Sequence, residues 1–87
     1  MTALEAYKAL PFEQRELVEQ IEYNLDIADQ CFSTIKAMLP DKGVVLMMLM
    51  DKYAESMHSQ MQAKEELEKA GYSEVQILNL RQGYCGE

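Results

Sequence analysis

The pattern of apolar and polar positions along the 87-residue chain predicts helices over most of its length. Two long stretches, at about 11–39 and 42–70, carry apolar residues three and four positions apart, which is the spacing of one helix face. Shorter stretches of the same kind lie at about 3–9 and 74–82. We therefore expect a single all-α domain, with a short mobile tail over 83–87.

Capping and breaking residues mark where these helices begin and end. Two pairs have the spacing of a capping box: Thr2 with Glu5, and Ser73 with Gln76. Pro11 disfavours helix at the residue before it, so a new helix is expected to start there. Residues 40–43 (PDKG) predict a tight turn, with Asp41 as the cap of the next helix. Because this connection is short, the two long helices are expected to form an antiparallel hairpin, with short helices at both ends of the chain.

Each long helix carries a heptad-spaced apolar row, which is typical of helices in a bundle. In the first helix the row consists of Val18, Ile21, Leu25, Ala28, Phe32, Ile35 and Leu39, widened by Leu17, Cys31 and Met38. In the second it consists of Met47, Met50, Ala54, Met57 and Met61, with a flanking row of Leu46, Leu49, Tyr53 and Leu67. We expect these rows to form the main helix-to-helix contacts.

Seven consecutive apolar residues, Val44–Met50, begin the second long helix. Such a run is apolar on every side of the helix, so a single neighbouring helix cannot cover it. It follows the turn directly and lies opposite both termini, where the short helices are poorly placed to reach it. We expect a second chain to cover it, as a homodimeric four-helix bundle, or else a different protein bound in a groove. The expected interface residues are Val44, Val45, Leu46, Met47, Met48, Leu49, Met50, Tyr53 and Met57.

The net charge of −7, from 15 acidic and 8 basic residues, argues against direct binding to nucleic acid or to an anionic membrane. Much of it lies in an acidic ridge on the first long helix, made of Glu13, Glu16, Glu19, Glu22, Asp26 and Asp29. Evenly spaced carboxylates could stand in for phosphates and occupy a basic nucleic-acid-binding protein. The alternative interpretation is an ordinary solvated helix face that keeps a small protein in solution.

One pattern in the chain suggests metal chemistry. Glu55 and His58 form a Glu-x-x-His pair on one helix face, and Glu22 could add a third ligand from the preceding helix. Di-metal helical bundles use such sets, so a dimeric di-metal protein is the alternative function. The chain has a single histidine, and Glu22 lies beside the apolar row rather than in it. A solvated flank is therefore the preferred interpretation, and no cofactor is expected.

The two cysteines, Cys31 and Cys85, are expected to be free thiols, with a disulfide between them as the alternative. The sequence contains no Gly-rich phosphate loop, no Cys-x-x-Cys pair and no Ser-His-Asp set at a readable spacing. The first residues lack the apolar core of a secretory signal, and the apolar run is too short to span a membrane. We expect a non-enzymatic, acidic protein–protein interaction module, acting as an inhibitor, adaptor or chaperone in the cytoplasm of a cell or an infected host cell.

Overall fold

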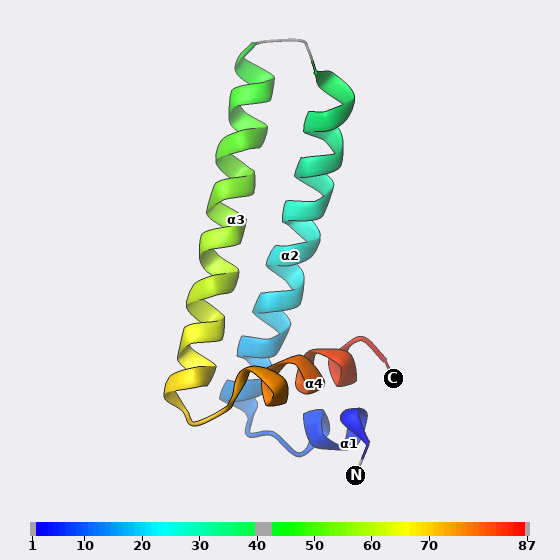
Figure 1. Ribbon diagram of the computed structural model, residues 1–87, viewed down its shortest axis with the longest axis vertical. Helices are drawn as coiled ribbons and strands as arrows, with labels where there is room; N and C mark the ends of the chain where they lie inside the picture. Colours follow the sequence, from blue (N-terminus) through cyan, green and yellow to red (C-terminus); the bar gives the residue numbers. More distant parts are fainter. Residues whose placement is uncertain (1, 40–42, 87) are drawn as a thin grey trace.

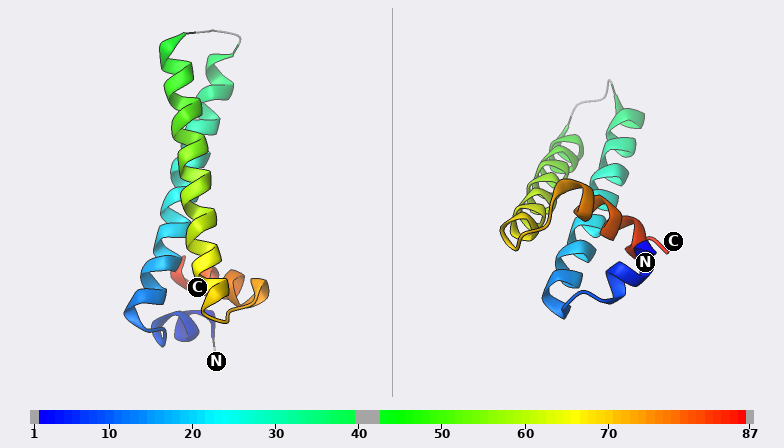
Figure 2. Two further views of the ribbon diagram at one scale, coloured as in Figure 1. Left: turned by 90° about the vertical axis from the view of Figure 1, so that its left-hand side faces the viewer. Right: turned by 60° about the horizontal axis from the view of Figure 1, so that its bottom comes forward.

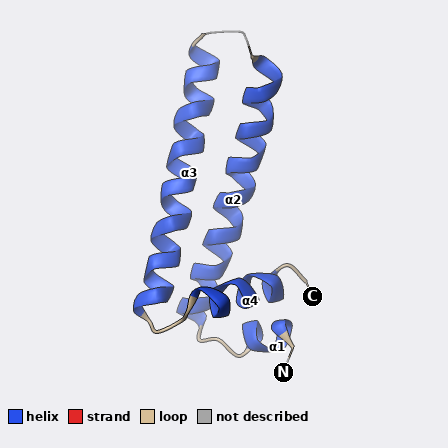
Figure 3. Ribbon diagram, in the orientation of Figure 1, coloured by secondary structure: helices blue, strands red, loops and turns tan. Residues whose placement is uncertain are grey.

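The computed structural model describes residues 2–39 and 43–86. These residues form four helices and no strand: α1 (Ala3–Lys8), α2 (Phe12–Met38), α3 (Val44–Lys69) and α4 (Glu74–Tyr84) (Figure 3). The two long helices, α2 and α3, lie side by side and run in opposite directions (Figure 1). The predicted all-α hairpin is confirmed.

The short helices α1 and α4 lie together at one end of the hairpin, which we call the base; the opposite end, where α2 ends and α3 begins, is the tip (Figures 1 and 2). α4 crosses the hairpin at the base, and α1 packs mainly against α4. The molecule is accordingly elongated, with extents of 48 × 25 × 19 Å. The tip half of the hairpin is built from α2 and α3 alone.

Local sequence signals explain most of the helix boundaries. Both predicted capping boxes form, with the Thr2 hydroxyl accepting from the Glu5 amide at 3.1 Å and the Ser73 hydroxyl from the Gln76 amide at 3.2 Å. Gly71 follows α3 with a φ of +105°, a left-handed conformation that glycine adopts without strain. α3 begins at Val44 rather than at about 42, and Gly43 holds the N-cap position that was predicted for Asp41. Residues 40–42 of the predicted turn, Asp41 among them, lie outside the described residues.

The end of α4 differs from the prediction. The helix continues through Gly83 to Tyr84, whereas a stop at residue 82 was expected because glycine often follows a helix. Gly83 is instead buried inside the helix, against the backbone of Ala3 in α1. The glycine permits a close crossing of two helices, so its residue type reflects packing rather than termination.

The main core lies at the base. It consists of Leu10, Val18, Ile21, Ala63, Leu67, Ile77 and Leu80, which are at most 9% exposed. All four helices or their connections contribute, and Tyr7, Leu25 and Tyr72 pack around this cluster. Most of the burial that stabilises a chain of this size is therefore concentrated at one end.

The contact between α2 and α3 uses only part of the rows expected: the buried residues of α2 all belong to its predicted row, whereas α3 buries its flanking row rather than its methionine row. On α3 the buried side chains are Leu46 and Leu67 of the predicted flanking row, together with Ser56 and Ala63, which continue that row at the same 3–4 spacing. On α2, Ala28 and Cys31 are buried while Phe32 and Leu39 are exposed. Small residues at the contact let the two helix axes approach closely, because the interaxial distance depends on the side chains between them. The bulkier methionine row is left on a flank.

Candidate protein-binding face

One side of the hairpin is covered by α4 at the base and uncovered beyond it. Leu25 of α2 and Lys64 of α3 line a hollow of about 430 Å³ together with Ile77 and Leu78 of α4. These four residues show which side of the hairpin α4 covers.

The same side continues toward the tip as an apolar surface. Seven residues are close to two helical turns, so residues seven apart share a helix face. Phe32 and Leu39 follow Leu25 at this interval, and Met57 and Met50 precede Lys64 at the same interval. Met47 adjoins Met50 one turn nearer the tip. We call the exposed set Phe32, Leu39, Met47 and Met50 the open face.

The side chains of the open face are half exposed or more. The exposed fractions are 50% for Phe32, 59% for Leu39, 65% for Met47 and 54% for Met50. Contiguous apolar surface of this kind on a soluble protein usually marks a binding site. The open face thus gathers four of the seven large apolar side chains that are exposed among the described residues between 32 and 50.

The aromatic residue of the open face is held in place by neighbours on both helices. The Phe32 ring lies 6.1 Å from the Tyr53 ring of α3, measured between centroids. On its own helix, the Lys36 ammonium lies 5.5 Å from the Phe32 centroid, a distance suited to a cation–π contact. These contacts give the face a defined aromatic centre flanked by flexible methionines.

The structure divides the predicted interface residues into two groups. Val44, Val45, Met47, Met48 and Met50 are all more than half exposed and open to a partner. Leu46 is buried within the hairpin, and Leu49, Tyr53 and Met57 are half-buried there. Met48 lies about 200° around α3 from Met50, so the two methionines face nearly opposite sides.

The acidic ridge is interrupted at its centre by contacts with the short helices. Glu13, Glu16, Asp26 and Asp29 are exposed, as the prediction requires. Glu19 accepts a hydrogen bond of 3.1 Å from the Tyr7 hydroxyl of α1. Burial, followed by the hydrogen bond and the charge of Glu19, raises the pKa of Tyr7 to about 12.

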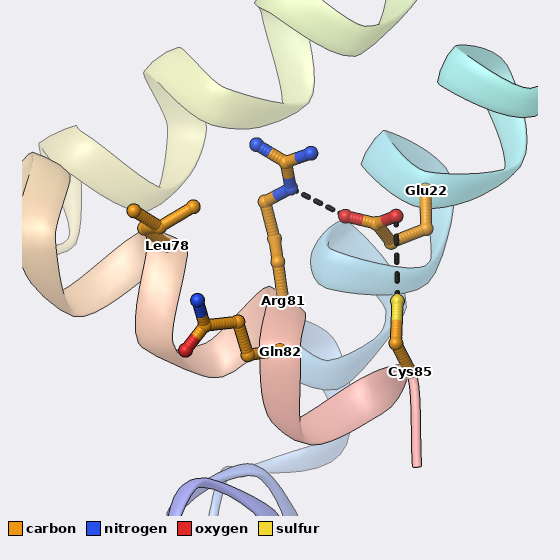
Figure 4. A pocket seen from close by; sticks show the side chains of 5 residues that line it. All are labelled: Glu22, Leu78, Arg81, Gln82 and Cys85. Carbon is orange, nitrogen blue, oxygen red and sulfur yellow. Dashed lines mark hydrogen bonds and ion pairs between the residues drawn. The ribbon is translucent and has the colours of Figure 1, made fainter. Parts of the chain in front are cut away.

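Glu22, at the middle of the ridge, joins α2 to α4 (Figure 4). Its carboxylate accepts from the Arg81 guanidinium on one oxygen and from the Cys85 thiol, at 3.6 Å, on the other. These groups line a pocket of about 190 Å³ together with Leu78 and Gln82. The Glu22 side chain is only 17% exposed, so this carboxylate serves the packing of α4 rather than an outside partner.

The Cys85 thiol is held in its protonated form. Burial, and then the negative charge of Glu22 and the hydrogen bond to it, raise the pKa of Cys85. Because the thiolate is the reactive species, this environment opposes nucleophilic chemistry. Cys31 is buried and free, and it lies nine residues, about 14 Å, along α2 from Glu22. That separation is too great for the disulfide considered from the sequence.

The alternative metal set does not come together in one chain. Glu55 and His58 are exposed on α3, whereas Glu22 is engaged by Arg81. Within residues 2–39 and 43–86, no three His, Cys, Asp or Glu side chains are grouped so that they could hold a metal ion. Both members of the Glu-x-x-His pair thus lie on an exposed flank of α3.

Tyr7, Arg81 and Gly83 carry structural roles that the sequence did not reveal. Arg81 pairs with a residue 59 positions away, and Tyr7 with one 12 positions away. Such pairings depend on how the short helices cross the base, which helical periodicity does not encode.

In the described part of the chain, no helix combines the length and apolarity needed to cross a membrane.

Comparisons with models of known protein families, with curated proteins and with solved structures find no match.

Proposed function

We propose that the chain is a non-enzymatic interaction protein, which acts as an inhibitor, adaptor or chaperone by binding another protein. The observation that carries this proposal is the open face. Four large apolar side chains from two helices are 50–65% exposed on one side of the hairpin. The two helices of the chain that could cover them lie at the base.

The physical basis of binding is the burial of this apolar surface. Transfer of a Leu, Met or Phe side chain from water into a contact contributes about 1.5–3 kcal/mol when burial is complete. Methionines adapt their shape to a partner, and the Phe32 ring supplies a rigid anchor. A few such residues at the centre of an interface commonly carry most of its binding energy.

The exposed carboxylates of the acidic ridge would act differently from the open face. Glu13 and Glu16 lie near the base, and Asp26 and Asp29 lie nearer the tip. Charges of one sign steer a partner of the opposite sign and raise the rate of association more than the affinity. We infer that the favoured partner is basic, such as a protein that normally binds nucleic acid, and that the encounter takes place in the cytoplasm.

Affinity capture with matched variants tests the proposal. The wild-type chain, Met50→Glu and Val75→Glu would be immobilised and exposed to the same lysate, with bound proteins identified by mass spectrometry. Val75 is 77% exposed on α4 and serves as the control, because it lies outside the open face. We expect a protein that the wild type and Val75→Glu retain and Met50→Glu loses. Equal capture by all three chains would exclude the open face as the binding surface.

The contribution of the ridge is tested separately. Replacing Glu13 and Glu16 by Gln removes two negative charges from exposed positions without changing side-chain size. We expect slower association with the captured partner and a weaker dependence of the rate on salt, with little change in the dissociation rate. An unchanged association rate would leave the ridge as a solvated helix face.

A further inference from the structure

The open face has apolar side chains at both of its ends. At the tip it ends with Leu39, and at the base it meets Leu78 of α4, which is 51% exposed and lines the hollow beside Leu25. Figure 4 shows Leu78 and Arg81 projecting from the same side of α4, toward the hairpin. α4 therefore forms a step at the end of the open face, and Leu78 lies on that step.

The charged groups at this step are paired within the chain. Arg81 is engaged by Glu22, and Lys64 forms an ion pair of 3.3 Å with Glu74 of α4. An apolar surface that approached the step would meet cations that already have partners. This lowers the desolvation cost that unpaired charges would impose.

We propose that the occupant of the open face is the open face of a second copy of this chain, in antiparallel orientation about a two-fold axis. The inference rests on the proposed function, in that it takes the open face to be a protein-binding surface, from which a different protein would displace the second copy. In such a contact the tip of each hairpin lies against the α4 step of the other. Leu39 of each chain then contacts Leu78 of the other, so that the tip end of each open face covers the base end of the other.

The dimensions of the open face fit this arrangement. The side of the hairpin that α4 leaves uncovered runs from Leu25, beside the α4 step, to Leu39, which is 14 residues or about 21 Å of helix; the open face occupies its tip half. Two packed helices are roughly 20 Å wide with their side chains. The projected area is thus about 400 Å², and the accessible area is larger because the side chains stand out from it. The projection alone supplies about half of the ~800 Å² per partner that a standard interface buries, and the side chains that stand out from the face supply further accessible area.

The step also fixes how far the two hairpins overlap. Each tip can slide along the other hairpin only until it meets α4, so the overlap is limited to the tip halves. There, α2 and α3 of both chains form a four-helix bundle, which covers apolar rows that a two-helix hairpin leaves in water. The base cores remain as separate layers at the two ends of the dimer, and the exposed acidic ridges stay available to another partner.

Two neighbouring methionines provide a matched test of the surface. Met50 lies on the open face and Met48 on nearly the opposite side of α3, with similar exposed fractions of 54% and 64%. By sedimentation equilibrium we expect twice the chain mass for the wild type and for Met48→Glu, and the chain mass for Met50→Glu and Phe32→Glu. Far-ultraviolet circular dichroism would show that all four chains keep their helices. A monomeric wild type, or a dimer equally sensitive to both methionines, would overturn the proposal.

Cross-linking tests the antiparallel orientation. In a background of Cys31→Ala and Cys85→Ser, single cysteines would be placed as Leu39→Cys in one sample and Leu78→Cys in another. With a short bismaleimide, we expect a cross-linked dimer only when the two samples are mixed and allowed to exchange chains. A parallel dimer would instead link Leu39→Cys to its own copy, and that result would overturn the arrangement.

The failure of this inference can be told apart from the failure of the proposed function. If the wild type is a monomer and still captures a different protein through Met50, the dimer is refuted and the proposed function is supported. If the wild type is a dimer and captures no other protein, the dimer is supported and the inhibitor, adaptor or chaperone role is refuted. A monomer that captures nothing removes both.

Discussion

Gly83 of α4 lies against the backbone of Ala3 in α1. A Cβ atom built at Gly83 would stand 2.2 Å from the Ala3 carbonyl oxygen and 2.6 Å from its carbonyl carbon. Real Cβ atoms do not approach backbone atoms so closely, so any other residue at this position forces the two helices apart.

The first prediction concerns this crossing. At a solvent-exposed position inside a helix, Gly→Ala raises the free energy of unfolding by about 1 kcal/mol, because alanine has the higher helix propensity. For Gly83→Ala we expect the opposite sign, a loss of about 1–3 kcal/mol from overpacking against α1. Urea unfolding followed by circular dichroism would measure it, with Gln82→Ala at the adjacent exposed position as the control. A stabilised Gly83→Ala variant would show that α1 is not held at this contact.

The second prediction concerns the ion pair between Glu22 and Arg81. Glu22→Gln removes the charge from a partly buried pair and weakens a charge-assisted hydrogen bond, which typically contributes about 1.5–3 kcal/mol. We expect a lower free energy of unfolding by roughly that amount. Lys64→Gln, in the exposed pair with Glu74, should cost less than about 1 kcal/mol. A loss below about 1 kcal/mol for Glu22→Gln as well would mean that the ion pair contributes little to holding α4.

The third prediction is a pH dependence. The pKa of Tyr7 is raised from 10.0 to about 12 in the folded chain, so folding favours the protonated hydroxyl. Its contribution to stability is therefore fully present below pH 10 and is lost as the pH rises toward 12. Tyr7→Phe should be less stable at neutral pH and should show a shallower loss of stability over this range. Chemical unfolding at a series of alkaline pH values would reveal it, and parallel curves for the two proteins would contradict it.

The fourth prediction concerns thiol reactivity. Because burial and Glu22 raise the pKa of Cys85, less thiolate is present at neutral pH than for an unhindered cysteine. We expect Cys85 to react slowly with a maleimide and Glu22→Gln to accelerate the reaction. Cys31 is buried and should react only when the chain unfolds. If Glu22→Gln leaves the rate unchanged, the carboxylate does not control the thiol.

Helix positions and the hairpin could be read from the sequence because they depend on local signals. These signals involve residues close together in the sequence. They are the Thr2 and Ser73 capping boxes, the helix stop at Gly71 and the 3–4 spacing of apolar residues. Pro11 caps α2, which starts at Phe12 rather than at Pro11. Such errors of one residue reflect the ambiguity of a helix end, not of the fold.

The face that each helix presents to its neighbour was harder to predict. Hydrophobicity favours the methionine row of α3, yet the hairpin buries the adjacent row, which includes Ser56 at 3% exposure. Close packing of two helices favours small side chains at the contact. A pattern of hydrophobic and polar positions contains no information on side-chain size. The position of the open face depends on this rotation and on where α4 crosses, so the sequence indicated an exposed apolar tip without locating its binding side.

The concentration of the core at the base implies a gradient of local stability along the hairpin. Amide hydrogens near Val18 and Leu67 are protected by the whole of the core, and they should exchange with solvent only through global unfolding. Those near Phe32 and Met50 lie in a two-helix segment and should exchange through local opening that leaves the base intact. Pairing of two tips would slow exchange in the tip segment selectively, which makes the exchange profile a direct readout of whether a single chain or an assembly is present.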